Sequence, residues 1–277
     1  MRVKVTGEII PNEYAWIYDF FGVPYFAPLS LMEAVREADP QDRELILEIN
    51  SPGGFVMAGF EIYSEIRKLR SLGWTTRAEI TALAASAATT IMVACETVLC
   101  SPVAQVMIHL PMMTADGNRI DFGEDIEVLK SLEESILNGY EIKSAGKATR
   151  TQLRHAMEAS TWMPAQKAID LGLVDGIIGD GSEVIFSAVD LAALAGQVVN
   201  SLQSGFGMSY AELLDRYEHG VQDGSLQPDP LHPVTCTAKT RAEDADPNLG
   251  RKDEVDPSNP GWQMQAWIEI ERERYRS

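Results

Sequence analysis

The sequence predicts an α/β fold over residues 1–186. Short apolar runs alternate along this part of the chain with segments of helical periodicity, which is the pattern of repeated β-α units. With 277 residues, 45% of them hydrophobic, the chain can bury one substantial core and still leave an appendage. We therefore expect one α/β domain followed by a C-terminal extension.

The first part of this domain contains five expected elements. In chain order they are a buried strand at 45–49, a helix at 57–70, a strand at 75–81, a helix at 86–95 and a strand at 103–108. The residues that could carry chemistry all lie at the ends of these elements.

The second part of the domain is predicted to begin with a long amphipathic helix at 122–144. Its apolar residues recur at steps of three or four, and they are Phe122, Ile126, Leu129, Leu132, Ile136 and Tyr140. A shorter helix at 165–171 is expected to end at Gly172. The apolar run at 173–178 predicts a closing strand.

The composition changes after Ser187. Residues 187–204 are rich in alanine and leucine and are expected to form a flanking helix. Residues 205–277 are acidic and rich in proline, with too little apolar mass to fold alone, so we expect a largely disordered linker and tail. The segment around Trp262 has the pattern of a short amphipathic helix that could dock on a partner, and a frayed terminus is the alternative.

Charge and composition exclude several classes of protein. The formal net charge of −18 argues against a nucleic-acid partner or an anionic membrane surface. The first residues lack the apolar core of a signal peptide, and no apolar run reaches the roughly 20 residues of a membrane span. Three cysteines, Cys95, Cys100 and Cys236, match neither a disulfide framework nor a metal cluster. We expect a soluble, cytoplasmic protein without a metal site.

Ser86 is the best candidate for a nucleophile. It lies at the predicted start of a helix, where backbone N–H groups and the helix dipole favour developing negative charge. The small residues around it leave room for a substrate carbonyl, and they are Ala84, Ala85, Ala87 and Ala88. A tightly packed helix is the alternative explanation for such a run.

His109 is the leading candidate for the base that a serine hydroxyl needs before it can attack. Its pKa near neutrality suits proton transfer, and it ends a predicted strand, from which a side chain can project into a cleft. A structural role is the alternative. The other histidines, His155, His219 and His232, lie in polar segments and compete poorly.

Gly53 and Gly54 form a turn between a predicted strand and a predicted helix. Backbone without side chains at this point lets a peptide substrate come close, although the turn could equally serve only to separate the strand from the helix. The N–H groups of Gly54 and Ala87 would together make an oxyanion hole with two donors. The order of the glycine turn, the serine segment and the histidine segment favours serine hydrolysis.

Four segments in order resemble the ClpP family of serine peptidases, and more closely the ClpP-like head maturation proteases of tailed phages and prophages. The segments are residues 50–54, 84–87, 107–111 and 168–175. The resemblance implies a ββα spiral of the ClpP/crotonase type with 122–144 as its handle helix, a ring homo-oligomer, and no cofactor. It also implies that Ser86 is the nucleophile, His109 the general base, and Gly54 with Ala87 the oxyanion donors.

The chain departs from the family pattern at three places. The third catalytic residue of the family, an acid, should precede Thr161, where this chain has Ser160. Glu158 is the candidate substitute, and a solvated surface charge is the alternative reading of that residue. Ala82 replaces a glycine that is usual four residues before the nucleophile. The Asp-Arg pair of the ring-to-ring contact is not evident around Glu158, and a longer leader is lacking, which favours the phage-type branch over docking to an ATPase.

The first functional hypothesis is a protease that cuts scaffold or capsid precursor protein inside an assembling phage head, the prohead. The 205–277 extension fits this role because a disordered arm could tether the enzyme to scaffold. The alternatives are a cytoplasmic ClpP-type subunit partnered with an ATPase, and a catalytically impaired ring protein, which Ser160 motivates. A crotonase-type acyl-CoA enzyme is the remaining rival by fold, but it would not need the serine and histidine segments.

Overall fold

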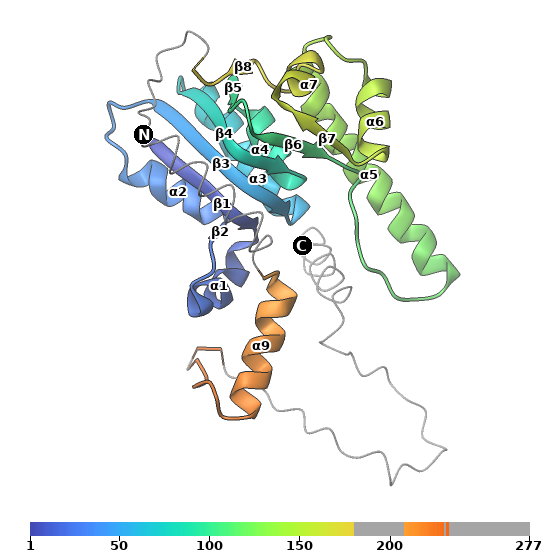
Figure 1. Cartoon of the computed structure of the whole chain (residues 1–277). Helices are drawn as coiled ribbons and strands as arrows, with labels where there is room; N and C mark the ends of the chain where they lie inside the picture. Colours follow the sequence, from blue (N-terminus) through green and yellow to red (C-terminus); the bar gives the residue numbers. More distant parts are fainter. Residues whose placement is uncertain (180–207, 230, 233–277) are drawn as a thin grey trace. The chain divides into compact units, whose positions relative to one another are not determined.

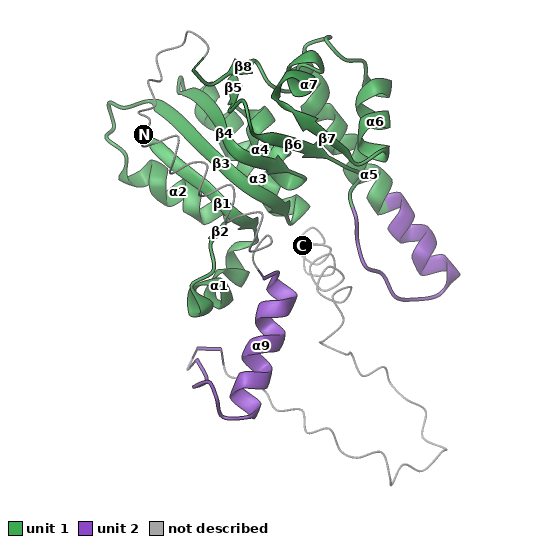
Figure 2. Ribbon diagram, viewed as in Figure 1, with its two compact units in different colours: residues 1–111, 128–207 green, residues 112–127, 208–277 purple. Residues whose placement is uncertain are grey.

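The computed structural model describes residues 1–179, 208–229 and 231–232. The chain divides into two compact units, one of residues 1–111 and 128–207 and the other of residues 112–127 and 208–277 (Figure 2). The flanking helix predicted at 187–204 and the helix predicted around Trp262 lie outside the described residues.

A single eight-stranded sheet forms the centre of the first unit (Figure 1). Its main path runs β2-β1-β3-β4-β5-β8, and β6 pairs with both β4 and β7. All pairings are parallel except that of β6 with β7, which is antiparallel. The strands are β1 Arg2–Ile9, β2 Tyr25–Phe26, β3 Glu44–Gly54, β4 Thr75–Ala85, β5 Thr97–Cys100, β6 Gln105–Ile108, β7 Thr161–Pro164 and β8 Gly176–Ile177.

Helices connect most of the parallel strands, and a short turn at 101–104 joins β5 to β6. The described helices are α1 Ala15–Phe21, α2 Pro28–Glu37, α3 Val56–Ser71, α4 Ala87–Ala94, α5 Arg119–Ser144, α6 Arg150–Glu158, α7 Ala165–Asp170 and α9 Tyr210–Gln222, with a short 3-10 turn at Asn12–Tyr14. Every residue of α4 is buried, because this helix has small and apolar side chains on all sides. It packs mainly against α3 and β3 in the core.

The predicted α/β class is confirmed by this architecture. The element boundaries differ most from the sequence prediction at three strands. Strand β3 continues past residue 49 to Gly54, where it pairs with β1. Strand β4 continues past residue 81 to Ala85, since its last residues pair with β6. The run at 173–178 forms only a two-residue strand, because the amides of Leu173 and Val174 donate to the carbonyl of Ala168 instead of to a neighbouring strand.

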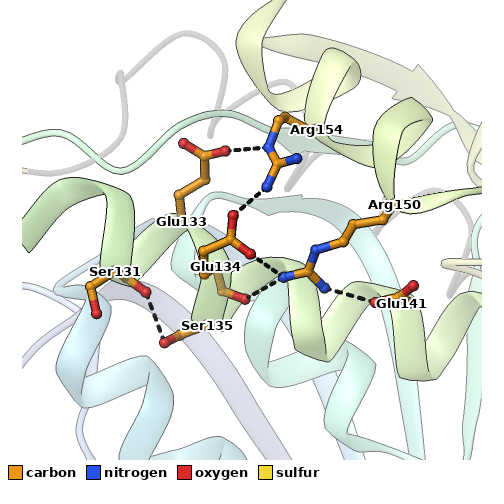
Figure 3. Close-up of polar contacts among 7 residues, drawn as sticks. All are labelled: Ser131, Glu133, Glu134, Ser135, Glu141, Arg150 and Arg154. Atoms are coloured by element: carbon orange, nitrogen blue, oxygen red, sulfur yellow. Dashed lines mark hydrogen bonds and ion pairs between the residues drawn. The ribbon is translucent and has the colours of Figure 1, made fainter. Parts of the chain in front are cut away.

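An ion-pair network joins α6 to the long helix α5 (Figure 3). Arg150 contacts Glu134 and Glu141, and Arg154 contacts Glu133 and Glu134. A single exposed ion pair contributes little to stability, but a network that shares residues restrains several side chains at once. It holds α6 along α5, and the chain leaves α6 directly for β7, the strand beside the histidine segment.

Helix α9 lies within the extension that was expected to be a largely disordered tail. A capping box of Ser209 and Glu212 begins it, and Leu213 and Tyr217 bury one face. The Ser-x-x-Glu spacing was the available signal for this helix. Among the described helices, none combines the length and apolar character that crossing a membrane requires.

Candidate active site

Ser86 joins the end of β4 to the first turn of α4. Its φ of 52° and ψ of −125° place a residue with a side chain in a region that favours glycine. Its amide donates to the Met107 carbonyl at 2.9 Å, which ties the serine backbone to β6. A nucleophile on a sharp turn between strand and helix presents its hydroxyl outward, as in hydrolases with a nucleophile elbow.

His109 follows β6, the parallel neighbour of β4. Its Nε2 lies 2.7 Å from the Ser86 Oγ, within hydrogen-bond reach. Burial lowers the pKa of His109 below its ordinary value of 6.5, and a hydrogen bond with the Leu110 backbone acts in the opposite direction with smaller effect. The imidazole is therefore kept neutral, the form that can take a proton from the serine.

Gly53 packs directly against the serine turn. With a φ of +98°, a Cβ at this position would stand 2.6 Å from both the Ser86 Cβ and the Ala85 carbonyl oxygen. Its amide donates to the Ser51 Oγ at 3.2 Å, and that buried hydroxyl donates to the Gly7 carbonyl. Gly53 thus lets the backbone of β3 come close to the serine turn, and its own N–H is already hydrogen-bonded to Ser51.

Gly54 is the last residue of β3 and pairs with Ile9 of β1. The next residue, Phe55, donates its N–H to the Ile9 carbonyl at 2.8 Å. Ala87 is the first residue of α4, so its N–H has no acceptor within the helix. Gly54 thus ends a strand and Ala87 begins a helix, and their role as oxyanion donors stays a prediction.

A small pocket opens beside the serine and the histidine. Its lining is largely apolar, with the hydroxyls of two side chains near Ser86, and consists of Val56, Ser86, Ala87, Thr90, His109, Leu110, Pro111, Ile136 and Tyr140. Tyr140 lies on the apolar face that the sequence predicts for the long helix, whereas Thr90 is not among the residues identified from the sequence. The signal that could have identified the threonine is a polar pair, Thr89 and Thr90, inside a helix that is otherwise apolar.

The candidate third residue, Glu158, lies at the end of α6. Its carboxylate is 3.2 Å from the Nδ1 of His155, and both side chains are strongly exposed, at 48% and 85%. The antiparallel register of β6 with β7 ends at the pairing of Ile108 with Thr161, so Ser160 directly precedes the paired segment and Glu158 lies two residues further away, in α6. Ser160 has a φ of 46°, the left-handed backbone that ends α6. The structure thus brings Ser86 and His109 together, and it places the Glu158 carboxylate beside a different histidine, His155.

Among the described residues, no group of three or more His, Cys, Asp or Glu side chains is arranged to hold a metal ion. The two buried cysteines, Cys95 and Cys100, have pKa values raised by burial to about 12, so they remain neutral thiols. The chemistry of this site is that of a hydroxyl, an imidazole and backbone amides.

Residues 30–181 match the Clp protease family. The chain belongs to the Clp protease family. The match covers the glycine turn, Ser86, His109 and Ser160, and it stops before the C-terminal extension.

Curated relatives in this family carry the name ATP-dependent Clp protease proteolytic subunit 1. The one from Chlamydia trachomatis serovar D is 30% identical over 174 residues, which cover 57% of this chain and 84% of the relative. The one from Chlamydia muridarum is 29% identical over 168 residues, with the same coverage of 57% and 84%. The one from Protochlamydia amoebophila is 29% identical over 147 residues, or 51% and 68%. The α/β sheet with its covering helices agrees with this family, and the closer likeness to phage enzymes stays a prediction.

Proposed function

We propose that this Clp protease family member is a serine endopeptidase with Ser86 as nucleophile and His109 as general base. The observation that carries the proposal is the 2.7 Å contact between the Ser86 Oγ and the His109 Nε2, beside a small pocket that both residues line. A hydroxyl this close to a neutral imidazole can lose its proton as it attacks a carbonyl carbon.

The reaction proceeds through an acyl-enzyme. As the Ser86 Oγ bonds to the scissile carbonyl carbon, its proton passes to the His109 Nε2, and the carbonyl oxygen gains negative charge. The N–H groups of Gly54 and Ala87 stabilise that charge. His109 then protonates the amine as its C–N bond breaks, which leaves the acyl-enzyme. Water, deprotonated by the same imidazole, attacks the acyl carbon, and the C–Oγ bond breaks as the proton returns to Ser86. None of these steps requires a cofactor.

Ser160 stands where the family has its acid, so we propose that the site works as a dyad. The hydrogen bond between the imidazole and the Leu110 backbone takes part of the orienting role that an acid would have. A serine cannot supply the negative charge that stabilises imidazolium, so a slower enzyme is expected than one with a full triad. If the missing negative charge reduces the rate to almost nothing, the protein is the catalytically impaired ring protein that Ser160 motivates.

Labelling with a fluorophosphonate probe tests the proposal directly. Wild-type protein should be labelled at Ser86 and should cleave peptides, and the Ser86→Ala variant should do neither. Absence of labelling in folded wild-type protein would instead support the assembly role without catalysis. Measuring the mass of the purified particle tests the ring homo-oligomer, which a monomer would contradict.

Two roles for the peptidase follow from different features. The 205–277 extension favours the maturation of phage heads, with capsid or scaffold precursor as substrate, because such an arm could carry the protease into the shell. The names of the relatives, which call those proteins ATP-dependent, favour a subunit that works with an ATPase.

Co-expression with a capsid precursor distinguishes the two roles. In the head-maturation role, wild-type protein shortens the precursor and Ser86→Ala protein does not, without any ATPase present. In the other role, the precursor stays intact, folded substrates are degraded only when a hexameric unfoldase and ATP are added, and the two proteins purify together.

A further inference from the structure

A buried chain of hydroxyl groups connects the long helix α5 to the backbone of Ser86. The Thr89 Oγ1 lies 2.5 Å from the Ser86 carbonyl oxygen and 2.5 Å from the Tyr140 hydroxyl. Both side chains are buried, Thr89 at 0% and Tyr140 at 2% exposure. No solvent therefore competes for these hydrogen bonds.

The direction of each bond follows from the number of protons. A carbonyl oxygen only accepts, so the single Thr89 hydroxyl proton is donated to Ser86. The Tyr140 hydroxyl must then be the donor to the Thr89 Oγ1. Burial raises the pKa of Tyr140 to about 12, so this donor keeps its proton throughout the neutral range. The order of donation is Tyr140 to Thr89 to the Ser86 carbonyl.

The Ser86 carbonyl shares a peptide plane with the Ala87 amide. The peptide bond is planar and trans, with its C=O and N–H pointing in opposite directions. The Ser86 oxygen is held on the helix side by the Thr89 hydroxyl and also by the Thr89 N–H at 2.9 Å. The Ala87 N–H is thereby aimed the other way, and donation to the carbonyl also polarises the amide as a donor.

A threonine that bonds the carbonyl three residues earlier is common near helix starts. Two further features distinguish this one. The peptide that it holds adjoins Ser86, whose φ of 52° must be maintained by its surroundings. The Tyr140 side chain that completes the chain of bonds comes from another helix and lines the same pocket as Ser86 and Ala87.

We propose that Thr89 and Tyr140 are positioning residues that aim the Ala87 N–H at the oxyanion during peptide cleavage. The inference rests on the proposed peptidase activity and adds to it two side chains that do not touch the reacting atoms. It assigns α5 a part in catalysis through its Tyr140 hydroxyl.

Four variants test the proposal by their kcat and KM for a fluorogenic peptide. Thr89→Val removes the donor to Ser86 at nearly constant volume and should lower kcat about 10-fold with little change in KM, less than the 10²–10³-fold expected when an oxyanion donor is lost outright. Tyr140→Phe should lower kcat by a smaller factor. Thr89→Ser keeps the hydroxyl and should restore kcat. The Thr89→Val, Tyr140→Phe double variant should be no slower than Thr89→Val, because both act along one chain.

A second measurement distinguishes a misdirected Ala87 N–H from a general loss of packing. The inhibition constant of a peptide aldehyde, which forms a tetrahedral adduct with Ser86, should rise by the same factor as kcat falls. Tyr217→Phe is the matched control, because it removes the bonded hydroxyl of another buried tyrosine on α9, in the other compact unit. It should leave kcat unchanged.

The outcomes distinguish this inference from the proposed function. Failure of wild-type protein to label at Ser86 overturns both. Active wild-type protein with unchanged kcat in Thr89→Val, or a Thr89→Ser variant as slow as Thr89→Val, overturns the positioning role alone. A loss of kcat without a parallel change in aldehyde affinity also overturns it.

Discussion

The Ser86 hydroxyl and the His109 imidazole, 23 positions apart in the chain, lie 2.7 Å from each other. They meet because Ser86 ends β4 and His109 ends β6, and these two strands are parallel neighbours whose carboxyl ends share one edge of the sheet. The Ser86 amide reinforces the contact by donating to the Met107 carbonyl, two residues before the histidine. The geometry of the pair is therefore set by backbone, and not by flexible loops.

Ser86→Ala should reduce peptide hydrolysis by at least about 10³-fold, because it removes the hydroxyl that lies within hydrogen-bond reach of His109. The melting temperature should change little, since His109 is the hydrogen-bond partner of the Ser86 Oγ among the described residues. Ser135→Ala, an exposed serine on α5, is the matched control and should retain full activity. Substantial hydrolysis by Ser86→Ala would assign the chemistry to another residue.

The dependence of kcat/KM on pH should show an acid limb with its midpoint below 6.5. His109 must be neutral to act as a base, and burial lowers its pKa, so the active form persists to lower pH than for a free imidazole. Activity is then lost as pH falls through the lowered pKa. A midpoint above 6.5 would mean that an anionic group stabilises the imidazolium.

Ser160→Asp should raise kcat by about 10-fold, because an acid at the position where the family has one would orient the His109 ring and stabilise its charged form. Aspartate tolerates the left-handed backbone found at this position better than most residues do. Ser160→Asn is the neutral control and should not accelerate the reaction. An activity of Ser160→Asp no higher than that of Ser160→Asn would contradict the dyad reading.

The Glu158→Gln variant tests whether Glu158 is the catalytic acid that the sequence predicts or a surface charge, as its position in the structure indicates. The carboxylate is paired with the exposed His155, so its neutralisation should leave kcat within about 2-fold of wild type. A loss of 10²-fold or more would show that Glu158 reaches His109 in the working enzyme. Arg36→Gln, at an exposed ion pair, is a suitable control for surface charge.

Gly53→Ala should lower the free energy of unfolding by about 1–3 kcal/mol and also reduce activity. The added Cβ would stand 2.6 Å from the Ser86 Cβ, so the serine turn must shift to accept it. Gly146→Ala is the matched control, because its φ of +88° carries a similar backbone penalty and nothing lies within 4 Å. Denaturant unfolding and peptide hydrolysis should show that only Gly53→Ala impairs catalysis.

Local sequence patterns were sufficient to predict several of the helices and strands around the site. The periodicity from Phe122 to Tyr140 predicted most of α5, and the glycine turn marked the junction of β3 and α3. The antiparallel strand β7 escaped prediction because it has only four residues and acquires its structure by pairing with β6. Helix α9 was overlooked because the surrounding composition outweighed its capping box.

The sequence by itself determined the α/β class, the order of the glycine, serine and histidine segments, and the identity of the groups available for chemistry. Only the tertiary structure decided which of these groups meet. Pairing of β4 with β6 brings Ser86 to His109, and the Glu158 carboxylate lies beside the exposed His155 instead. The link from Tyr140 through Thr89 to Ser86 likewise exists only when α5 packs on α4. Such contacts depend on register and packing between distant segments, and local periodicity carries no information about either.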